Sequence, residues 1–474
     1  MIRLLPPAKS TAQTDAYQLF LARKAISDPA TGLSNLPGLP DALFPFQHDL
    51  VSWALRRGRA AIFAGTGLGK SLMELSWGNA IASQAPGAMV LLLAPLAVSA
   101  QLLREAAKFG VPARMARSQA DCGPGVNITN YQKLEHFDLS QFLGVVLDEA
   151  SILKSTDGHY KSLLISECAK VPFRLTATAT PAPNDFMELG NQAEFLGVMS
   201  HTDMLATFFA HDGGETQKWR LKGHAENEFW KWMASWSVML RKPSDLGYDD
   251  AGYDLPPLRR QQHVVASELP PSGMLFALPA ETLQERISAR RDTIAERVAK
   301  AIEITPSDRP FVWWCNLNSE SEALTKSIPG AVETKGSDSD EVKERKLIDF
   351  SEGRTRVLVT KPAVAGFGMN WQHCADTGFV GLNDSFEQVY QAVRRFWRFG
   401  QTQPVTAHFI SAEVEGAVMA NLARKEADAD RMAAGMVLHM ADLSSLAVRG
   451  SVRDTPNYNP QQPVALPTWL EAAE

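Results

Sequence analysis

The sequence is poor in the features that mark secreted, zinc-binding and membrane proteins. Its four cysteines are widely spaced and include no C-x-x-C pair: Cys122, Cys168, Cys315 and Cys374. This spacing argues against a disulfide framework or a zinc site and favours a reducing cytoplasm. The longest apolar run, 87–100, is too short to cross a bilayer and is interrupted by Pro95. We therefore expect a soluble protein with no membrane partner.

The sequence also lacks an excess of positive charge and a recognisable leader. Its formal net charge is -6, so binding to nucleic acid would depend on a local basic groove. The N-terminus has no apolar signal-peptide core. Absence of a targeting segment is typical of a prokaryotic or viral protein that acts in cytoplasm, which for a virus is the host cytoplasm. The length of 474 residues suggests about three domains.

What the chain does contain is a glycine-rich octet, Ala64 to Ser71, between an apolar strand pattern at 60–63 and a helix start at 72–77. Glycines let backbone N–H groups face phosphate oxygens, and the helix N-terminus adds partial positive charge. The pattern G-x-x-x-x-G-K-[ST] is matched except that Ala64 replaces its first glycine. We expect Lys70 to contact the β- and γ-phosphates of ATP and the Ser71 hydroxyl to bind Mg²⁺. The remaining loop residues would also bind the nucleotide: Gly65, Thr66, Gly67, Leu68 and Gly69.

Two acids follow the aliphatic run 145–147, at the carboxyl end of a predicted strand, where open α/β sheets bind ligands. Asp148 can hold Mg²⁺ directly or through water, and Glu149 can polarise the water that attacks the γ-phosphate. The threonine-rich segment 174–181 can supply hydroxyls that hydrogen-bond this acidic pair. Upstream, Gln47 carries both a donor and an acceptor, which suit the edge of adenine.

The segments 65–71, 148–151 and 175–181 resemble motifs I, II and III of superfamily 2 helicases, in that order. They resemble most closely the motifs of the Swi/Snf-type branch. Further segments resemble the family's Q motif (Phe46-Gln47), motif Ia (94–110), I-T-x-Y segment (128–131), motif IV (310–315) and motif V (365–370, which includes Gly368). The segment 391–401 resembles the pattern Q-A-x-D-R-x-x-R-x-G-Q. The ordered set covers roughly residues 43–410.

The resemblance places Arg395 and Arg398 at the family's arginine positions. On a helix, a spacing of three puts both side chains on one face. Guanidinium groups there suit a γ-phosphate held across a cleft. Arg394 stands where the family has aspartate, so the sequence leaves open which of the three arginines is dominant.

The resemblance implies an α/β protein with two RecA-like parallel-sheet lobes, a helical insertion and a helical C-terminal extension. The expected division is an N-terminal arm (1–40), lobe 1 (41–185), an insertion and linker (186–258), lobe 2 (259–412) and an extension with a Pro-rich tail (413–474). Within the insertion, Phe229, Met233, Trp236 and Leu240 have the spacing of one helical face. They would form either an aromatic core or a stacking platform for nucleic acid.

The function that the resemblance implies is an ATP- and Mg²⁺-dependent motor on nucleic acid. We expect a DNA-dependent ATPase that translocates on duplex DNA and contacts mainly phosphates. Two alternatives remain open at this point. One is a helicase that separates strands of DNA or RNA, and the other is a non-catalytic clamp that uses ATP as a switch.

Overall fold

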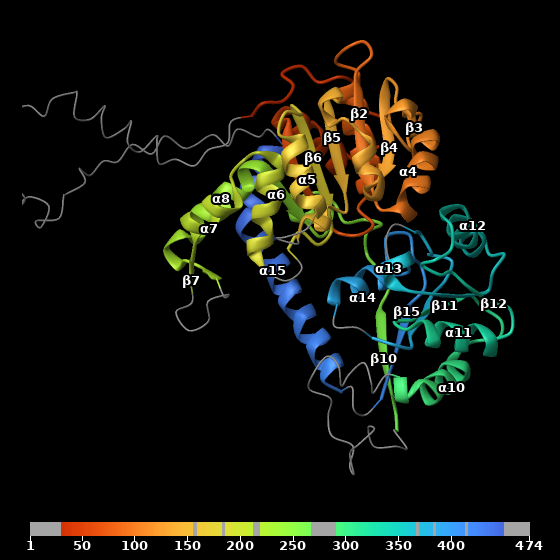
Figure 1. The fold of residues 1–474 in the computed structure, drawn as a ribbon. Coiled ribbons are helices and arrows are strands. Elements are labelled where there is room, and N and C mark those ends of the chain that lie inside the picture. The colour runs from red at the N-terminus through yellow and green to blue at the C-terminus, as the bar shows by residue number, and fades with distance from the viewer. Residues whose placement is uncertain are drawn as a thin grey trace, which may run out of the picture.

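The computed structural model describes residues 30–154, 159–182, 185–211, 219–266, 291–365, 369–382, 385–412 and 416–449. It confirms the predicted fold class, because the chain forms two parallel-sheet α/β lobes followed by a long C-terminal helix (Figure 1). The domain boundaries themselves stay predictions. Among the described residues, none of the helices combines the length and apolar character needed to span a membrane.

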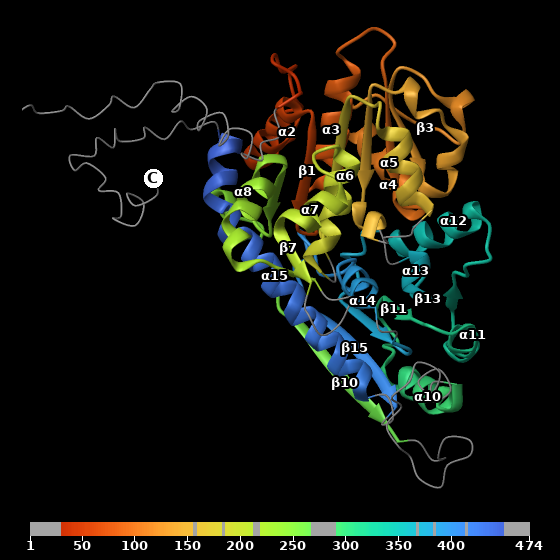
Figure 2. The ribbon, with the colours of Figure 1, turned by 60° about the vertical axis from the view of Figure 1, so that its left-hand side comes forward.

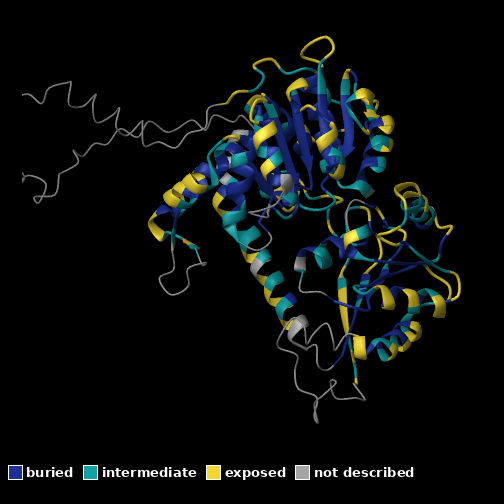
Figure 3. Ribbon diagram, viewed as in Figure 1, coloured by how far each residue is buried: buried dark blue, intermediate teal, exposed yellow. Residues whose placement is uncertain are grey.

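Lobe 1 is built on a seven-stranded sheet whose paired strands are all parallel. In spatial order the strands are β3 (Ala113–Met115), β4 (Gly125–Asn130), β2 (Met89–Ala94), β5 (Gly144–Asp148), β6 (Phe173–Thr178), β1 (Arg59–Ala64) and β9 (Ser237–Leu240). Its central strands are continuous apolar runs that are buried on both faces, as Figure 3 shows.

Alternate residues of these strands point into two separate cores. Ile62 and Val146 pack with one set of helices: α2 (Pro45–Arg57), α3 (Lys70–Ala82) and α4 (Leu96–Lys108). Phe63 and Leu147 pack on the other face with α5 (His159–Cys168), α6 (Leu189–Leu196), α7 (His201–Phe208) and α8 (Glu226–Trp236). A small hairpin, β7 (Phe209–His211) and β8 (Trp219–Leu221), follows α7.

The prediction that Leu240 shares a helical face with Phe229 is wrong. Helix α8 ends at Trp236, and the next residues form β9, which pairs with β1 through Ile62 and Val238. Three consecutive apolar residues, 238–240, allow a strand that is buried on both faces, and they continued the helical spacing by coincidence. Phe229 and Trp236 are fully buried, so the aromatic residues of α8 form a core and not an exposed stacking platform.

Lobe 2 is built on a six-stranded sheet whose paired strands are also parallel. The order is β10 (Leu258–Val265), β15 (Val405–Ala412), β14 (Asp376–Phe379), β11 (Phe311–Trp314), β13 (Val357–Thr360) and β12 (Ala331–Glu333). Its helices are α10 (Ile294–Ile304), α11 (Asn318–Ser327), α12 (Asp340–Ser351), α13 (Pro362–Ala365) and α14 (Phe386–Val393).

Helix α15 (Gly416–Arg449) connects the two lobes along one side of the molecule (Figures 1 and 2). Near its start, Leu422 belongs to the core of lobe 2, and Arg260 of β10 forms an ion pair with Glu426. Further along, Met436 and Met440 belong to the core of lobe 1 that contains α8. The helix therefore packs into the hydrophobic cores of both lobes.

Candidate functional site

The glycine-rich loop joins β1 to α3 as predicted, and its geometry depends on two glycines. Gly67 and Gly69 have φ values of 92° and 78°, which side chains of L-residues rarely adopt. Gly69 is the N-cap of α3, so Lys70 and Ser71 lie in the first turn of that helix. The Lys70 ammonium donates a hydrogen bond to the carbonyl oxygen of Ala64 at 3.0 Å, which holds it across the loop.

Three of the predicted nucleotide-binding residues hold the loop in place through contacts with the rest of lobe 1. Gln47 is buried at 3% exposure, and its Nε2 donates to the Leu68 carbonyl oxygen at 2.8 Å. The Leu68 side chain lies in the core of lobe 1. The Gly65 N–H donates to the Leu240 carbonyl oxygen at 2.9 Å, which ties the loop to the end of β9.

The acidic pair lies at the carboxyl end of β5, beside the loop. Asp148 and Glu149 are 6% and 8% exposed. Glu149 has φ of 53° and is the one non-glycine residue with positive φ in the part of the chain that the structure describes. Such a backbone conformation is costly and clusters at functional sites. Thr178 donates to Glu149 Oε2 at 3.4 Å, and the buried Tyr131 hydroxyl donates to the Asp148 carbonyl oxygen at 2.6 Å.

A third carboxylate, Glu74 on α3, completes a buried acidic cluster that the sequence did not reveal. Glu74 is 1% exposed. Burial, followed by the charge of Asp148, raises the pKa of Glu74 well above its usual value. Burial, followed by the charge of Glu149, raises the pKa of Asp148 to about 7, although Lys70 acts in the opposite direction. Burial beside Asp148 therefore favours the protonated form of Glu74.

Lobe 2 brings its arginines to the same site, but the prediction that a helix presents them is wrong. Helix α14 ends at Val393, and Arg395 and Arg398 lie in the turns that follow. Phe396 is buried in the core of lobe 2, which anchors these turns to the sheet. Both arginines face lobe 1 from a loop at the edge of lobe 2.

The three arginines have different surroundings. Arg395 donates to the Gln391 carbonyl oxygen at 2.9 Å, to Gln391 Oε1 at 3.0 Å and to the Met369 carbonyl oxygen at 3.3 Å. Burial and the neighbouring Arg398 lower the pKa of Arg395 to about 10. Arg394 lies over the rings of Tyr390 and Trp397, with its guanidinium carbon 5.0 and 4.3 Å from their centroids.

Arg398 has few hydrogen bonds within its own lobe. Its Nη1 donates to the Met369 carbonyl oxygen at 3.5 Å, and its buried Nε has no hydrogen-bond partner among the described residues. Burial lowers the pKa of Arg398, but the carboxylates of Glu105 and Glu149 favour its charged form. Glu105 is itself oriented by a 2.8 Å hydrogen bond from Gln101 Nε2.

These groups line one cavity of about 330 Å³ between the lobes. Lobe 1 contributes seven lining residues that the sequence predicted as site residues: Thr66, Gly67, Gly69, Lys70, Ser71, Asp148 and Glu149. It also contributes Val98, Gln101 and Glu105, which lie in the segment 94–110. Lobe 2 contributes Asn370, Gln372, Arg395, Arg398, Phe399 and Gly400. Gly368 lies outside the described residues. The volume is within the range of small-molecule sites.

The donor set of this cavity fits a magnesium ion that arrives with a nucleotide. The Ser71 hydroxyl and the Asp148 carboxylate both line the cavity and offer oxygen atoms as ligands. No cluster of three or more His, Cys, Asp or Glu suited to a metal occurs in the described ranges. Magnesium typically uses one or two carboxylates together with substrate phosphates, which agrees with this set.

A second hollow between the lobes lies beside the segment 94–110. Thr129 Oγ1 and Asn130 Oδ1 are buried there without hydrogen-bond partners among the described residues. Lys133 and Arg117 line the same hollow from lobe 1. From lobe 2, the acidic start of α12 faces them, with Glu341 4.0 Å from Arg117. The hollow therefore combines hydroxyl, amide and cationic groups of lobe 1 with the carboxylates of Asp340, Glu341 and Glu344 of lobe 2.

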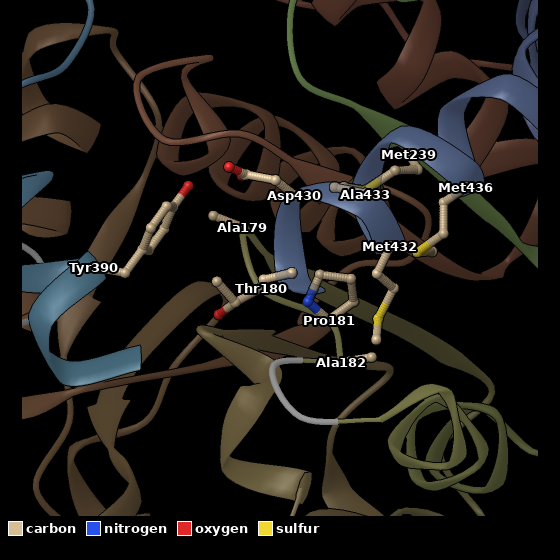
Figure 4. Close-up of a pocket in the computed structure, with 11 residues that line it drawn as sticks. Ala179, Thr180, Pro181, Ala182, Met239, Tyr390, Asp430, Met432, Ala433 and Met436 are labelled. Atoms are coloured by element: carbon tan, nitrogen blue, oxygen red, sulfur yellow. The ribbon is translucent and has the colours of Figure 1, made fainter. Parts of the chain in front are cut away.

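A small cavity of about 60 Å³ lies where α15 meets both lobes (Figure 4). The segment Ala179–Ala182, which follows β6, forms one wall, and Tyr390 of α14 forms another. Met432 and Met436 of α15 close it. Helix α15 therefore contacts the segment that directly follows Thr178, the hydrogen-bond partner of Glu149.

Comparisons with known proteins give a distant likeness. No family model matches the chain, and no curated protein matches it in sequence. Among solved structures, the chain is similar to a SWI2/SNF2 ATPase core of Sulfolobus solfataricus, described as in complex with dsDNA. The identity is 17%, the TM-score is 0.41, and the match covers 88% of this chain and 98% of that one.

Proposed function

We propose that this protein is a superfamily 2 ATPase of the Swi/Snf type, which hydrolyses ATP between its lobes and translocates on duplex DNA. One observation carries the proposal: Lys70, Glu149 and Arg398 line a single cavity although they come from different lobes. A phosphate loop, a water-orienting acid and an arginine supplied across a cleft are the parts that phosphoryl transfer requires.

Each residue has a definite task in this mechanism. The loop N–H groups and Lys70 bind the β- and γ-phosphates, and Lys70 exchanges its bond to Ala64 for phosphate oxygens. Glu149, held by Thr178, orients and deprotonates the attacking water. Magnesium, held by Ser71 and Asp148, would neutralise phosphate charge. Arg398 stabilises the charge that develops on the γ-phosphate, because its buried Nε has no competing acceptor among the described residues.

Lobe closure then couples hydrolysis to movement along DNA. Arg398 belongs to lobe 2 and its target to lobe 1, so bound ATP favours the closed form and product release favours opening. The hollow lined by Thr129, Asn130, Lys133 and Arg117 supplies phosphate contacts on lobe 1. Contacts of this kind give binding that weakens steeply with salt and varies little with sequence.

The catalytic part of the proposal is tested with Glu149→Gln and Lys70→Ala. We expect Glu149→Gln to bind Mg·ATP and to lose hydrolysis, and Lys70→Ala to weaken nucleotide binding. The measurement is ATPase rate without polymer and with single-stranded DNA, duplex DNA or RNA. Hydrolysis at the wild-type rate by Glu149→Gln would show that another group orients the water.

The translocation part is tested with two substrates. Displacement of a triplex-forming third strand from duplex DNA reports translocation, and release of a labelled strand from a tailed duplex reports unwinding. We expect ATP-dependent triplex displacement without strand release. Strand release without triplex displacement would establish a helicase instead, and ATP-sensitive binding without either activity would establish a clamp.

A further inference from the structure

One turn of lobe 1 adjoins both the acidic pair and the hollow lined by Thr129, Asn130 and Lys133. This turn is the 3₁₀ helix Tyr131–His136, which begins directly after β4 and carries Lys133. Tyr131 is 3% exposed, and its side chain belongs to the lobe 1 core that contains the aromatic residues of α8. The turn therefore presents one side chain to the hollow and another to the interior of the lobe.

The Tyr131 hydroxyl holds the peptide unit that joins the two acids. It donates a 2.6 Å hydrogen bond to the Asp148 carbonyl oxygen. That oxygen and the Glu149 N–H belong to one planar unit, so a bond to the oxygen restrains the rotation of the whole unit. The φ of Glu149 is 53°, a costly conformation that persists only where its surroundings hold it. Tyr131 supplies part of that support.

This hydrogen bond is protected from water. Tyr131 and Asp148 are both buried, at 3% and 6% exposure, and a hydrogen bond is stronger in such surroundings than in water. Burial, followed by the charges of Asp148, Glu74 and Glu149, raises the pKa of Tyr131 well above its usual value. The phenol therefore stays protonated and remains a donor.

The hollow contains polar atoms that have no partners. Thr129 Oγ1 and Asn130 Oδ1 are buried and make no hydrogen bond within the described part of the chain. The acidic start of α12 lines the same hollow, yet it does not bond to the Thr129 hydroxyl. Because a buried polar group without a partner is costly, a ligand that accepts from Thr129 favours one position of the end of β4.

We propose that Tyr131 is a positioning residue, which couples binding of a DNA phosphate in this hollow to the orientation of Glu149. A phosphate bound by Thr129 and Lys133 fixes the turn, and the turn fixes the Tyr131 hydroxyl. The hydroxyl then holds Glu149 in the conformation that orients the attacking water. This inference rests on the proposed function, because it assumes that the cavity hydrolyses ATP and that the hollow binds DNA.

The test is Tyr131→Phe, which keeps the buried ring and removes the hydroxyl. The measured quantity is the stimulation by DNA, that is, kcat with saturating duplex DNA divided by kcat without DNA. One hydrogen bond is worth about 2- to 10-fold, so we expect the stimulation to fall by about that factor. KM for ATP and Kd for duplex DNA should stay within about twofold of the unmodified values, which also shows that the variant is folded.

Tyr248→Phe is the matched control, because it removes another tyrosine hydroxyl of lobe 1, which donates to Asp49. We expect it to leave the stimulation within about twofold. Thr129→Val removes the hydroxyl at the other end of the route and should also lower the stimulation at saturating DNA. The double variant Thr129→Val with Tyr131→Phe should lose no more stimulation than the weaker of the two single variants, because both changes interrupt one route.

Three results would overturn the inference. Stimulation unchanged in Tyr131→Phe would show that the hydroxyl has no part in the response to DNA. An equal loss of hydrolysis with and without DNA would make Tyr131 a support of the acids that does not sense the hollow. Losses that multiply in the double variant would assign Thr129 to a separate route. Failure of the proposed function is distinct, because hydrolysis by the unmodified protein would then be absent or would not respond to DNA.

Discussion

At the scale of single residues, the surroundings of three neighbouring arginines separate their roles. Arg394 packs on two aromatic rings, Arg395 is held by three acceptors of its own lobe, and Arg398 makes one long hydrogen bond. A guanidinium that is poorly satisfied at rest loses least when it turns to a phosphate. The sequence could not rank these residues, because the ranking depends on acceptors such as the Met369 carbonyl oxygen.

We therefore predict that Arg398→Ala lowers kcat by about 10³-fold or more, as expected for an arginine finger, with ATP affinity nearly unchanged. Arg394→Ala serves as the matched control and should retain hydrolysis within about tenfold. The measurement is single-turnover ATP hydrolysis together with nucleotide binding. Loss of turnover in Arg394→Ala with an active Arg398→Ala would reverse the assignment.

The buried acids Asp148 and Glu74 should make the free energy of unfolding depend on pH. The folded-state pKa of Asp148 is raised to about 7, and that of Glu74 is also raised, so the folded protein binds more protons than the unfolded chain. The contribution of Asp148 is therefore greatest at low pH and is lost as pH rises from about 4 through about 7, and that of Glu74 is lost in the same direction. We expect Glu74→Gln, whose side chain cannot ionise in the folded or the unfolded state, to raise the free energy of unfolding at pH 8 by about 1–3 kcal/mol.

The control for this prediction is the same comparison at pH 5, where the gain should be smaller. Chemical denaturation without nucleotide or magnesium gives both values. An equal change at the two pH values would show that packing, and not charge, causes the effect. The burial of Glu74 could not be predicted from the sequence, because a single acid within a helix is usually exposed.

At the scale of elements, the acidic first turn of α12 faces the proposed phosphate contacts of lobe 1. Glu341 and Arg117 are both largely exposed and 4.0 Å apart, so their attraction in the free protein is weak. The same carboxylate would nevertheless repel a DNA phosphate at this hollow. We predict that Glu341→Lys strengthens duplex binding several-fold and steepens its salt dependence by about one unit of log slope.

Glu303→Lys is the matched control, because Glu303 is a similarly exposed acid on α10 and also belongs to a surface ion pair. Fluorescence anisotropy at several salt concentrations gives affinity and slope for both variants. Equal strengthening by the two substitutions would indicate a general effect of net charge. Weakening of DNA binding by Glu341→Lys would place the DNA path elsewhere.

Elements with strong local signals were predictable, whereas those set by tertiary contacts were not. The sequence correctly predicted the strands before Asp148 and before the phosphate loop, since uninterrupted apolar runs mark buried parallel strands. It missed β9, whose apolar residues also fit the spacing of α8. It extended α14 past Val393, where core packing of Phe396 overrides helical propensity.

At the scale of the whole molecule, α15 joins the cores of the two lobes. Met436 is 1% exposed in the core of lobe 1, whereas Leu438, two residues later, is 77% exposed. We predict that Met436→Asp destabilises lobe 1 by several kcal/mol, because it buries a charge without a partner. Leu438→Asp should be neutral within about 0.5 kcal/mol.

Calorimetry tests this prediction and also reports whether the lobes unfold together. We expect one transition for Leu438→Asp and two for Met436→Asp, since loosening α15 uncouples the lobes. Two transitions in the unmodified protein would show that α15 does not couple them. A single transition in Met436→Asp at the unmodified temperature would show that its buried position contributes little.

Strand β9 lies at the edge of the lobe 1 sheet but comes late in the sequence of that lobe. Its partner β1 leaves the ribosome early, but β9 is synthesised only after the remaining strands of lobe 1 and three helices of the insertion. Until then, the nascent chain exposes an unpaired β-edge, the kind of surface that invites wrong pairing. The Leu240 carbonyl that secures Gly65 is also missing during this interval. We therefore expect the glycine-rich loop to reach its final geometry only after β9 has been synthesised and has paired with β1.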